Sequence, residues 1–429
     1  MNLPHQNTSR ESTVGSFRTM QAVQTKGRGA FNTLCNYLIL FFVFLYQYVS
    51  KGDYSDSLAD LVAVIAIILA LIQITAMLIV GTFYINNTYQ NTSHYYLFLL
   101  ILFIFSFFYF FCQRRFDLVV GLLVCVALHN WDIDSFFKAT GILSSIMYGS
   151  HLLLYRLGYI QEHARIMDRA TDNGTIYRYA IGFDHPNFTA PFILLILASA
   201  IGCRRTSQRL IFGAIGFLYS IISYEYTNSR TALAATLFAI VILLFSFFIK
   251  SPHLYVLFPV TTIASVGLML YLAFAYHDDP TVNFRWSQRP SIIYNLFQDY
   301  GLSLYGNEEL NTINRETGGS IDNYWFNLLF SYGIIITIVV FVLLYILCKT
   351  SCRYNSPNMV WVVVMYMVYG MSEHHVFDYG FSILSILIFM PIVYPLFFAP
   401  TGDNRKIAKR MPQSRRQNRQ RRQQSPSWR

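Results

Sequence analysis

The run LYVLFPVTTIASVGLMLYLAFA, residues 254–275, has no charged side chain and is long enough to cross a bilayer as a single helix. A second run of this kind, NYWFNLLFSYGIIITIVVFVLLYIL, occupies residues 323–347. These runs are continuous in Leu, Ile, Val and Phe, whereas a closed β-barrel would have short alternating segments. The sequence therefore predicts an all-α, polytopic transmembrane protein.

The composition supports this class. Of the 429 residues, 54% are hydrophobic and 17% aromatic, and the mean hydropathy is +0.40, which is too apolar for a soluble domain. We expect about twelve spans within a membrane domain of residues 31–398. They lie near residues 31–49, 58–80, 94–112, 117–131, 137–155, 187–203, 210–225, 231–249, 254–275, 323–347, 358–373 and 378–398.

The net charge of +10 is concentrated in two tails, residues 1–30 and 399–429. Beside membrane spans, basic tails favour cytoplasmic ends near anionic lipid headgroups over nucleic-acid binding. Residues 1–30 lack the apolar core of a signal peptide, and the Gln- and Arg-rich tail 399–429 is expected to be disordered. If both tails are cytoplasmic, the order of the spans puts Arg204, Arg205, Arg209, Lys250, Lys349 and Arg353 on the inner face of a cell membrane, as the charge bias expects. It leaves Arg114 and Arg115 on the outer face, so either the early spans are miscounted or these side chains are interfacial.

The six cysteines lie in or beside apolar runs, as small packing residues do. Cys348 and Cys352 have a spacing that a metal could use, but no nearby His or Cys supports it. We expect neither a metal site nor a cofactor.

The same order of spans places two long segments on the outer face of the membrane, residues 156–186 and 275–323. The second is the longest polar interval between apolar runs, yet it keeps aromatic and apolar residues that a solvated linker does not need. A short amphipathic helix beginning at Pro290 is expected within it. We therefore expect a small, partly helical extracytoplasmic cap.

Segment 156–186 has arginines on the side where positive charge is normally depleted. Their guanidinium groups either bind a phosphate-bearing ligand or pair with acidic residues of the same segment. Helix-entry residues follow, with Asn187 or Asp184 as the expected cap. His185 is a candidate base or phosphate donor, or a plain hydrogen-bonding residue. The arginines are Arg156, Arg165, Arg169 and Arg178.

Further candidates flank later spans. Arg230 lies where a short outer turn re-enters the membrane, and it either reaches the headgroups or helps a helix N-terminus to hold an anion. Arg285 and Arg289 lie in the second outer loop. Asp322 is either the cap of the next span or part of an acid/base site, and Glu373 lies at the outer edge of a later span.

Four pieces in this order resemble the O-antigen ligase/polymerase superfamily across roughly residues 130–390. They are RYAIGFDHPN (178–187), NSRT (228–231), the loop with Arg289 that ends in DNYWFNLLFSYGII (322–335), and Glu373. The chain is most similar to Wzy-type polysaccharide polymerases of Gram-positive capsule and exopolysaccharide systems.

The resemblance implies metal-independent, inverting glycosyl transfer on the outer face of the cytoplasmic membrane. The growing glycan would leave undecaprenyl diphosphate for an incoming lipid-linked repeat unit. Carried over by position, Arg178, Arg230 and Arg289 would hold diphosphate, and His185, Asp322 or Glu373 would act as the base. A flippase and a chain-length regulator of the same pathway would be partners.

Two alternatives remain. A ligase would use the same donor with another lipid or protein acceptor, so the arginines do not separate it from a polymerase. A transporter or flippase of lipid-linked oligosaccharide would need charged residues along a path through the membrane midplane. The spans are nearly free of charge, which argues against transport.

Overall fold

The structure is a computed structural model that describes residues 32–52, 56–79, 104, 117–128, 131–161, 169–171, 174–176, 178–183, 185–310, 321–373, 376 and 382–393. Among these residues, six helices are long and apolar enough to cross a membrane. This confirms the prediction of a helical membrane protein, while the total of about twelve spans stays a prediction. The six are Asn32–Lys51, Ser57–Ala76 within α2 (Asp56–Ile79), α7 (Thr206–Thr227), α8 (Arg230–Phe248), Leu254–Tyr276 and Tyr324–Arg353.

Two of these spans are composite. Leu254–Tyr276 joins the 3-10 turn η2 (Leu254–Val256) to α9 (Leu257–Tyr276). Tyr324–Arg353 joins α13 (Tyr324–Asn327), a π-helical turn η3 (Leu328–Tyr332) and α14 (Gly333–Arg353). Gly333 has φ +88°, which ends the π-helical turn before α14 begins.

Other helices occupy further predicted spans: α4 (Asp117–Ala127), α5 (Ile133–Arg156), α6 (Thr189–Gly202) and α15 (Asn358–Tyr369). The predicted run 378–398 is not one helix in its described part. It forms α16 (Leu384–Leu387) and α17 (Met390–Val393). Pro391 explains the break, because proline is tolerated in the first turn of a helix but not in its interior. The predicted span 94–112, Arg114, Arg115 and both tails lie outside the described residues, apart from Ile104.

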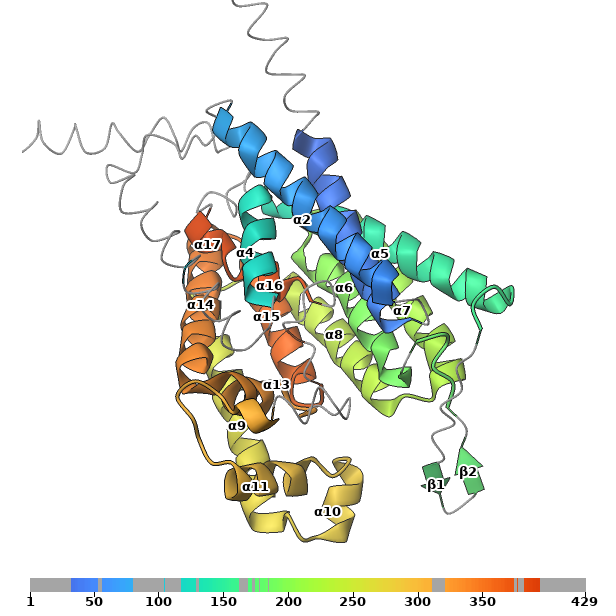
Figure 1. Ribbon diagram of the computed structural model, residues 1–429, viewed down its shortest axis with the longest axis vertical. Helices are drawn as coiled ribbons and strands as arrows, with labels where there is room; N and C mark the ends of the chain where they lie inside the picture. Colours follow the sequence, from blue (N-terminus) through green and yellow to red (C-terminus); the bar gives the residue numbers. More distant parts are fainter. Residues whose placement is uncertain are drawn as a thin grey trace, which may run out of the picture.

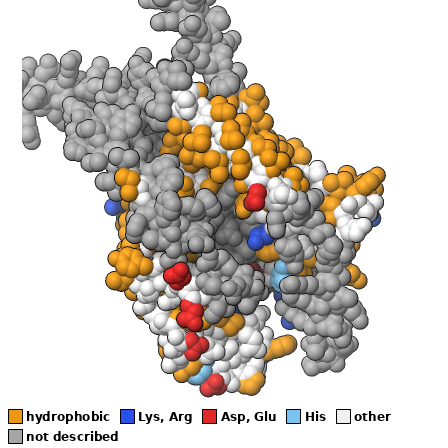
Figure 2. Space-filling model, viewed as in Figure 1, with side chains coloured by type: hydrophobic (Ala, Val, Ile, Leu, Met, Phe, Trp, Pro, Cys, Tyr) orange, Lys and Arg blue, Asp and Glu red, His pale blue; other side chains and the backbone are white. Residues whose placement is uncertain are grey.

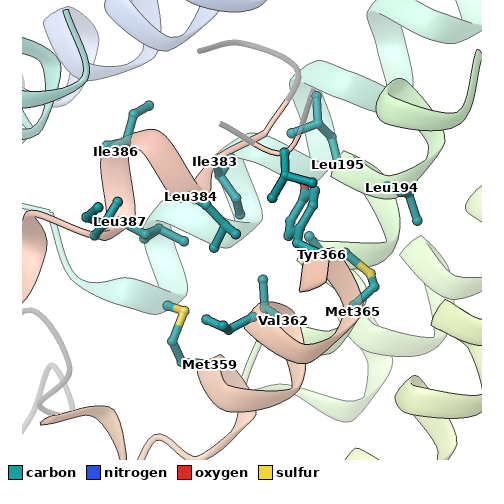
Figure 3. Packing of buried hydrophobic residues seen from close by; sticks show 14 of the residues in the cluster. Leu194, Leu195, Met359, Val362, Met365, Tyr366, Ile383, Leu384, Ile386 and Leu387 are labelled. Carbon is teal, nitrogen blue, oxygen red and sulfur yellow. The ribbon is translucent and has the colours of Figure 1, made fainter. Parts of the chain in front are cut away.

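Helices α6 and α15 form the centre of the molecule. Every residue of α6 is buried, as is nearly every residue of α15, and a helix that is apolar on all sides is a core helix. Leu194 and Leu195 of α6, Met365 and Tyr366 of α15, and residues of α16 such as Leu384 lie in the same packed cluster (Figure 3).

The two central helices run in opposite directions. At one end, Asn358 Nδ2 donates to the Cys203 carbonyl at 3.5 Å, and Arg204 Nη2 donates to Ser356 Oγ at 3.3 Å. The start of α15 therefore lies beside the end of α6. It follows that the start of α6 and the segment after α15 share the opposite end, where the candidate site is found.

The outer helices present apolar side chains to their surroundings. In a membrane such a surface faces acyl chains, whereas on a soluble monomer it would be an unusually large patch. Figure 2 shows hydrophobic side chains over α2, with acidic side chains toward the end formed by α10 and α11. Exposed examples are Leu210, Phe217 and Leu218 of α7, Leu237, Val241 and Leu244 of α8, and Val260, Ile263 and Tyr271 of α9.

The segment predicted to form the cap is partly helical in its described part, as expected, and the helix expected from Pro290 is α11 (Arg289–Asp299). With α10 (Pro280–Arg285) it lies beyond α9 (Figure 1), and it has its own small core, which includes Ile293, Leu296 and Phe330. Segment 156–186 departs from the all-α expectation, because β1 (Arg169–Thr171) and β2 (Gly174–Ile176) form an antiparallel pair. This pair lies at the same end as α10 and α11, away from α17 (Figure 1).

Candidate functional site

The side chain of Asn187 joins three segments that are distant in sequence. Its Nδ2 donates to Glu373 Oε1 at 2.8 Å. Its Oδ1 accepts from Arg178 Nη2 at 3.0 Å and from Ser229 Oγ at 2.7 Å. We call these four residues the Asn187 network. An amide can play both parts because it carries donors and an acceptor in one planar group.

Local structure positions Asn187 at the entrance to α6. The short helix η1 (Pro186–Phe188) begins after His185, whose Nδ1 accepts from the Asn187 backbone N–H at 3.1 Å. His185 is therefore the cap, in place of the expected Asn187 or Asp184, and Asp184 lies outside the described residues. With Nδ1 as acceptor, the neutral ring of His185 has its proton on Nε2.

The turn that precedes His185 is held in place by contacts with α5 and with the end of the first span. Ile181 has φ +54° and Gly182 φ +74°, a left-handed pair that is unfavourable for the β-branched isoleucine. His151 Nε2, on α5, bonds to the Ile181 carbonyl at 2.7 Å and therefore donates. The His151 ring stacks on Phe183, with centroids 4.1 Å apart, and Phe183 pairs with Gly52 at the end of the first span. Packing thus over-determines the turn that carries Arg178 and His185.

The other end of the network is the start of α8. Ser229 caps this helix by accepting from the Ala232 N–H at 3.2 Å while it donates to Asn187. Arg178 is buried, and its Nε donates to the carbonyl of Thr227, the last residue of α7, at 3.2 Å. The helix N-terminus expected beside Arg230 is therefore present, at the start of α8.

Arg289 connects the cap to the same region. It is 7% exposed, and its nitrogens donate to the carbonyls of Trp286 (3.3 Å), Asp322 (2.9 Å) and Ser372 (2.5 Å). Its Nη2 also lies 3.7 Å from Asp322 Oδ2. One guanidinium therefore fixes α11 against the start of α13 and the residue that precedes Glu373.

Asp322 is not the helix cap that one reading of the sequence suggested. Asn323 caps α13 by accepting from the N–H groups of Trp325 and Phe326, at 3.1 and 3.2 Å. The carboxylate of Asp322, which is 46% exposed, is turned toward Arg289. Its charge is consequently available to the site.

Glu373 is 4% exposed and lies in this charged environment. Burial raises the pKa of its carboxyl to about 8, and the Asp322 carboxylate acts in the same direction, against Arg289, the Asn187 hydrogen bond and Arg178. A carboxyl group with this pKa exchanges a proton near neutral pH. Such groups are enriched at catalytic sites, although structural networks also perturb pKa values.

The structure thus brings together the five residues expected to be catalytic: Arg178, His185, Arg289, Asp322 and Glu373. It does not join the expected substrate-binding arginines to them. Within the described residues, no hydrogen bond or ion pair links the network to Arg156 at the end of α5, Arg230 at the start of α8 or Arg285 at the end of α10, and all three are exposed. Arg169 lies in β1 without a described side chain, and Arg165 lies outside the described residues.

Sequence reasoning missed the central part played by Asn187 and the bond from Ser229. The available signal was the position of each residue just before an apolar run, which was interpreted as helix capping alone. Over the part of the chain that the structure describes, no three His, Cys, Asp or Glu side chains gather as metal ligands would. No family model, curated protein or solved structure matches the chain.

Proposed function

We propose that this protein is a polysaccharide polymerase that acts on lipid-linked glycans at the outer face of a bacterial cytoplasmic membrane. The observation that carries the proposal is the buried carboxyl group of Glu373 in a helical membrane protein. Its partner Asn187 also bonds to buried Arg178, and the carbonyl of the preceding residue, Ser372, accepts from buried Arg289. Two fixed guanidinium groups suit a diphosphate, and the carboxylate suits the removal of a proton from a hydroxyl group.

In the proposed reaction, a hydroxyl oxygen of the incoming repeat unit attacks the anomeric carbon of the growing glycan. The bond from that carbon to the diphosphate breaks with inversion, undecaprenyl diphosphate leaves with the bonding electrons, and the hydroxyl proton passes to Glu373. Arg178 and Arg289 stabilise the negative charge that develops on the departing diphosphate.

Of the three candidate bases, the contacts favour Glu373. His185 uses Nδ1 to accept from the Asn187 N–H, so its Nε2–H is suited to donating to a phosphate oxygen. Asp322 Oδ2 lies 3.7 Å from Arg289 Nη2, so this carboxylate is already the partner of an arginine. Glu373 is the group whose pKa is raised toward the operating range, and Asn187 orients its oxygen.

The proposed orientation is supported by the basic residues at the other ends of the helices. Helix α7 ends at the site with Thr227 and begins after Arg205, while α8 begins at the site and ends before Lys250. Arg353 ends α14. Because basic residues favour the cytoplasmic side, the site would face the outer side. The proposed topology has about twelve spans and both termini in the cytoplasm. Lipid headgroups would then surround the basic helix ends. A flippase and a chain-length regulator are the proposed partners.

The test uses purified protein in nanodiscs with its undecaprenyl-diphosphate repeat unit and EDTA, followed by gel analysis. We expect a ladder from the wild type and from Arg205→Ala, an exposed arginine at the opposite end, and no ladder from Glu373→Gln. If wild-type protein binds the donor but leaves it unreacted, polymerase activity is excluded. A ligase would then transfer the glycan to another added acceptor, and a transporter would not.

A further inference from the structure

The loop Gly301–Asn307 exposes apolar side chains at an unusual place. Leu302 is 54% exposed, Leu304 55% and Tyr305 66%. Exposed acidic residues lie on both sides of the loop, with Asp299 before it and Glu308 after it. An apolar group of this kind with a charged border is typical of a surface that contacts a partner or a membrane.

Backbone hydrogen bonds fix this loop to a membrane-spanning helix. The N–H of Ile334 donates to the Ser303 carbonyl at 3.0 Å, and that of Ile335 donates to the Leu304 carbonyl at 3.3 Å. Asn307 donates through its backbone to the Phe330 carbonyl at 3.0 Å. The first N–H groups of a helix have no partner within it, so the break at Gly333 creates donors that the loop satisfies.

Two glycines allow this close approach. Gly306 has φ +90° and Gly333 φ +88°. A Cβ atom on Gly306 would collide with the Ser331 carbonyl oxygen, and one on Gly333 would collide with Gly306 N and the Leu304 carbonyl oxygen. The loop and the helix are therefore in direct backbone contact, and the height of the loop is set by the helix.

That height follows from the length of α14. Its 21 residues, at about 1.5 Å each, span about 30 Å, which is about the thickness of a bilayer hydrocarbon core. The last residue is Arg353, a natural inner boundary. Gly333 and Ile334 then lie at the outer boundary, and the loop lies beside them.

The loop also continues the lipid-facing side of α14. Ile338, Val342 and Ile346 recur every four residues and are 57%, 45% and 36% exposed. Ile334 precedes Ile338 by one further step of four and bonds to Ser303. The loop is therefore bonded to α14 at the residue where this row of apolar side chains begins.

We propose that the Gly301–Asn307 loop is a membrane-docking element whose Leu302, Leu304 and Tyr305 side chains insert among the acyl chains at the outer boundary of the bilayer. Asp299 and Glu308 stay in water. The loop thereby seats the cap at a fixed height, because it follows directly from α11, the helix that carries Arg289. This inference depends on the membrane architecture alone and stands whether or not the protein is a polymerase.

Spin labels at three substituted cysteines test the proposal in nanodiscs. Tyr305→Cys reports on the loop, Ile338→Cys is the lipid-facing control, and Phe284→Cys on α10, whose native side chain is also 66% exposed, is the cap control. The labelled wild type gives the background. Oxygen concentrates in lipid, whereas a nickel chelate stays in water, and the ratio of their effects on a label measures its depth.

We expect the oxygen-to-nickel ratio to be highest at position 338, intermediate at 305 and lowest at 284. A ratio at 305 equal to that at 284 would place the loop in water and overturn the proposal. A label at 305 that neither reagent reaches would also overturn it, because the loop would then be covered by another part of the chain or by a second copy. Elution as a single species checks that each variant is folded.

Discussion

Burial in the protein raises the pKa of the Glu373 carboxyl group to about 8. In an unfolded chain it would be ionised at neutral pH, and here burial outweighs two arginines and an amide. The cost of ionising it in place is what makes it a usable base. That cost also links its chemistry to the stability of the fold.

The first prediction concerns pH. Because only ionised Glu373 accepts a proton, the initial rate of polymer formation is expected to rise as pH increases from 6, to reach half its maximum near pH 8 and to level off above about 9. Glu373→Gln should reduce the plateau rate at high pH at least ~100-fold and should abolish the rise with pH. Rates of ladder formation across buffers of constant ionic strength provide the measurement, and a flat wild-type profile between pH 6 and 9 would contradict the assignment.

The same group has an effect on stability of known sign. A raised carboxyl pKa means that the folded state retains a proton that the unfolded state loses, so this contribution is present below pH 4.5 and declines as pH rises to about 8. Glu373→Gln removes the effect. As pH rises from 5 to 8, the melting temperature of Glu373→Gln should therefore increase relative to that of the wild type. This measurement separates loss of activity from loss of folding.

Arg289 gives the second prediction. Its three nitrogens reach carbonyl groups of three chain segments, which the single ammonium group of lysine does not match. Arg289→Lys should therefore lower polymer yield ~100-fold although the charge is kept, and Arg289→Ala should abolish polymer. Immunoblots of membrane fractions check protein amount. Near wild-type polymer from the lysine variant would show that charge alone suffices.

The sequence identified which residues belong to the site, but it did not show which of them contact one another. The sequence indicated Arg178, His185, Arg289, Asp322 and Glu373, because charged groups beside apolar runs are unusual. It did not indicate that Asn187 bonds to Ser229, 42 residues away, and to Glu373, 186 residues away. Such bonds depend on how α6, α8 and the segment after α15 pack, which local patterns do not encode.

At the scale of elements, the length of the apolar runs predicted where helices lie. It did not predict whether a helix is surrounded by lipid or by protein. Helix α15 has 12 residues and α6 has 14, and both are enclosed by protein, yet each was expected to be an ordinary span. Lipid-facing and protein-facing helices are both apolar, so composition does not tell them apart. The π-helical turn before Gly333 also had no signal in the run that contains it.

Three glycines yield a graded prediction. Gly333→Ala combines positive φ with a backbone collision and should destabilise the protein by more than ~2 kcal/mol. Gly301→Ala has positive φ in open space and should cost about 1 kcal/mol. Gly267→Ala, within α9 and in open space, should be neutral or stabilising by up to ~1 kcal/mol. Melting temperatures in one detergent give the order, and equal effects would contradict the account of the α14 contact.

At the scale of the whole molecule, the two ends of the bundle differ in charge and in architecture. The Asn187 network lies where α7 ends and α8 begins, and Arg205, Lys250 and Arg353 flank the opposite ends of α7, α8 and α14. The positive-inside rule gives this asymmetry a direction that the fold by itself does not. The sequence predicted that the two long loops lie on the same side of the membrane, because loop charge and the order of the spans can both be read from it.

This orientation is testable in intact cells. Phe284→Cys, on the cap, should react with a membrane-impermeant maleimide added outside, and Arg205→Cys should react only after the cells are permeabilised. The wild type is the control, since its described cysteines, Cys35, Cys125, Cys203, Cys348 and Cys352, are all buried. The reverse pattern of labelling would invert the topology and rule out chemistry at the outer face.

The enclosure of α6 and α15 has a consequence for how the surrounding lipid acts on the protein. When acyl chains are lengthened or shortened, the helices that contact them adjust by tilting. The central pair is enclosed by protein, so we expect the strain of such a mismatch to reach the site through lipid-facing helices that end in it, among them α7 at Thr227 and α8 beside Ser229. We therefore expect bilayer thickness to act as a mechanical input to the hydrogen bonds around Asn187, in part through the turn of residues 227–230 between α7 and α8.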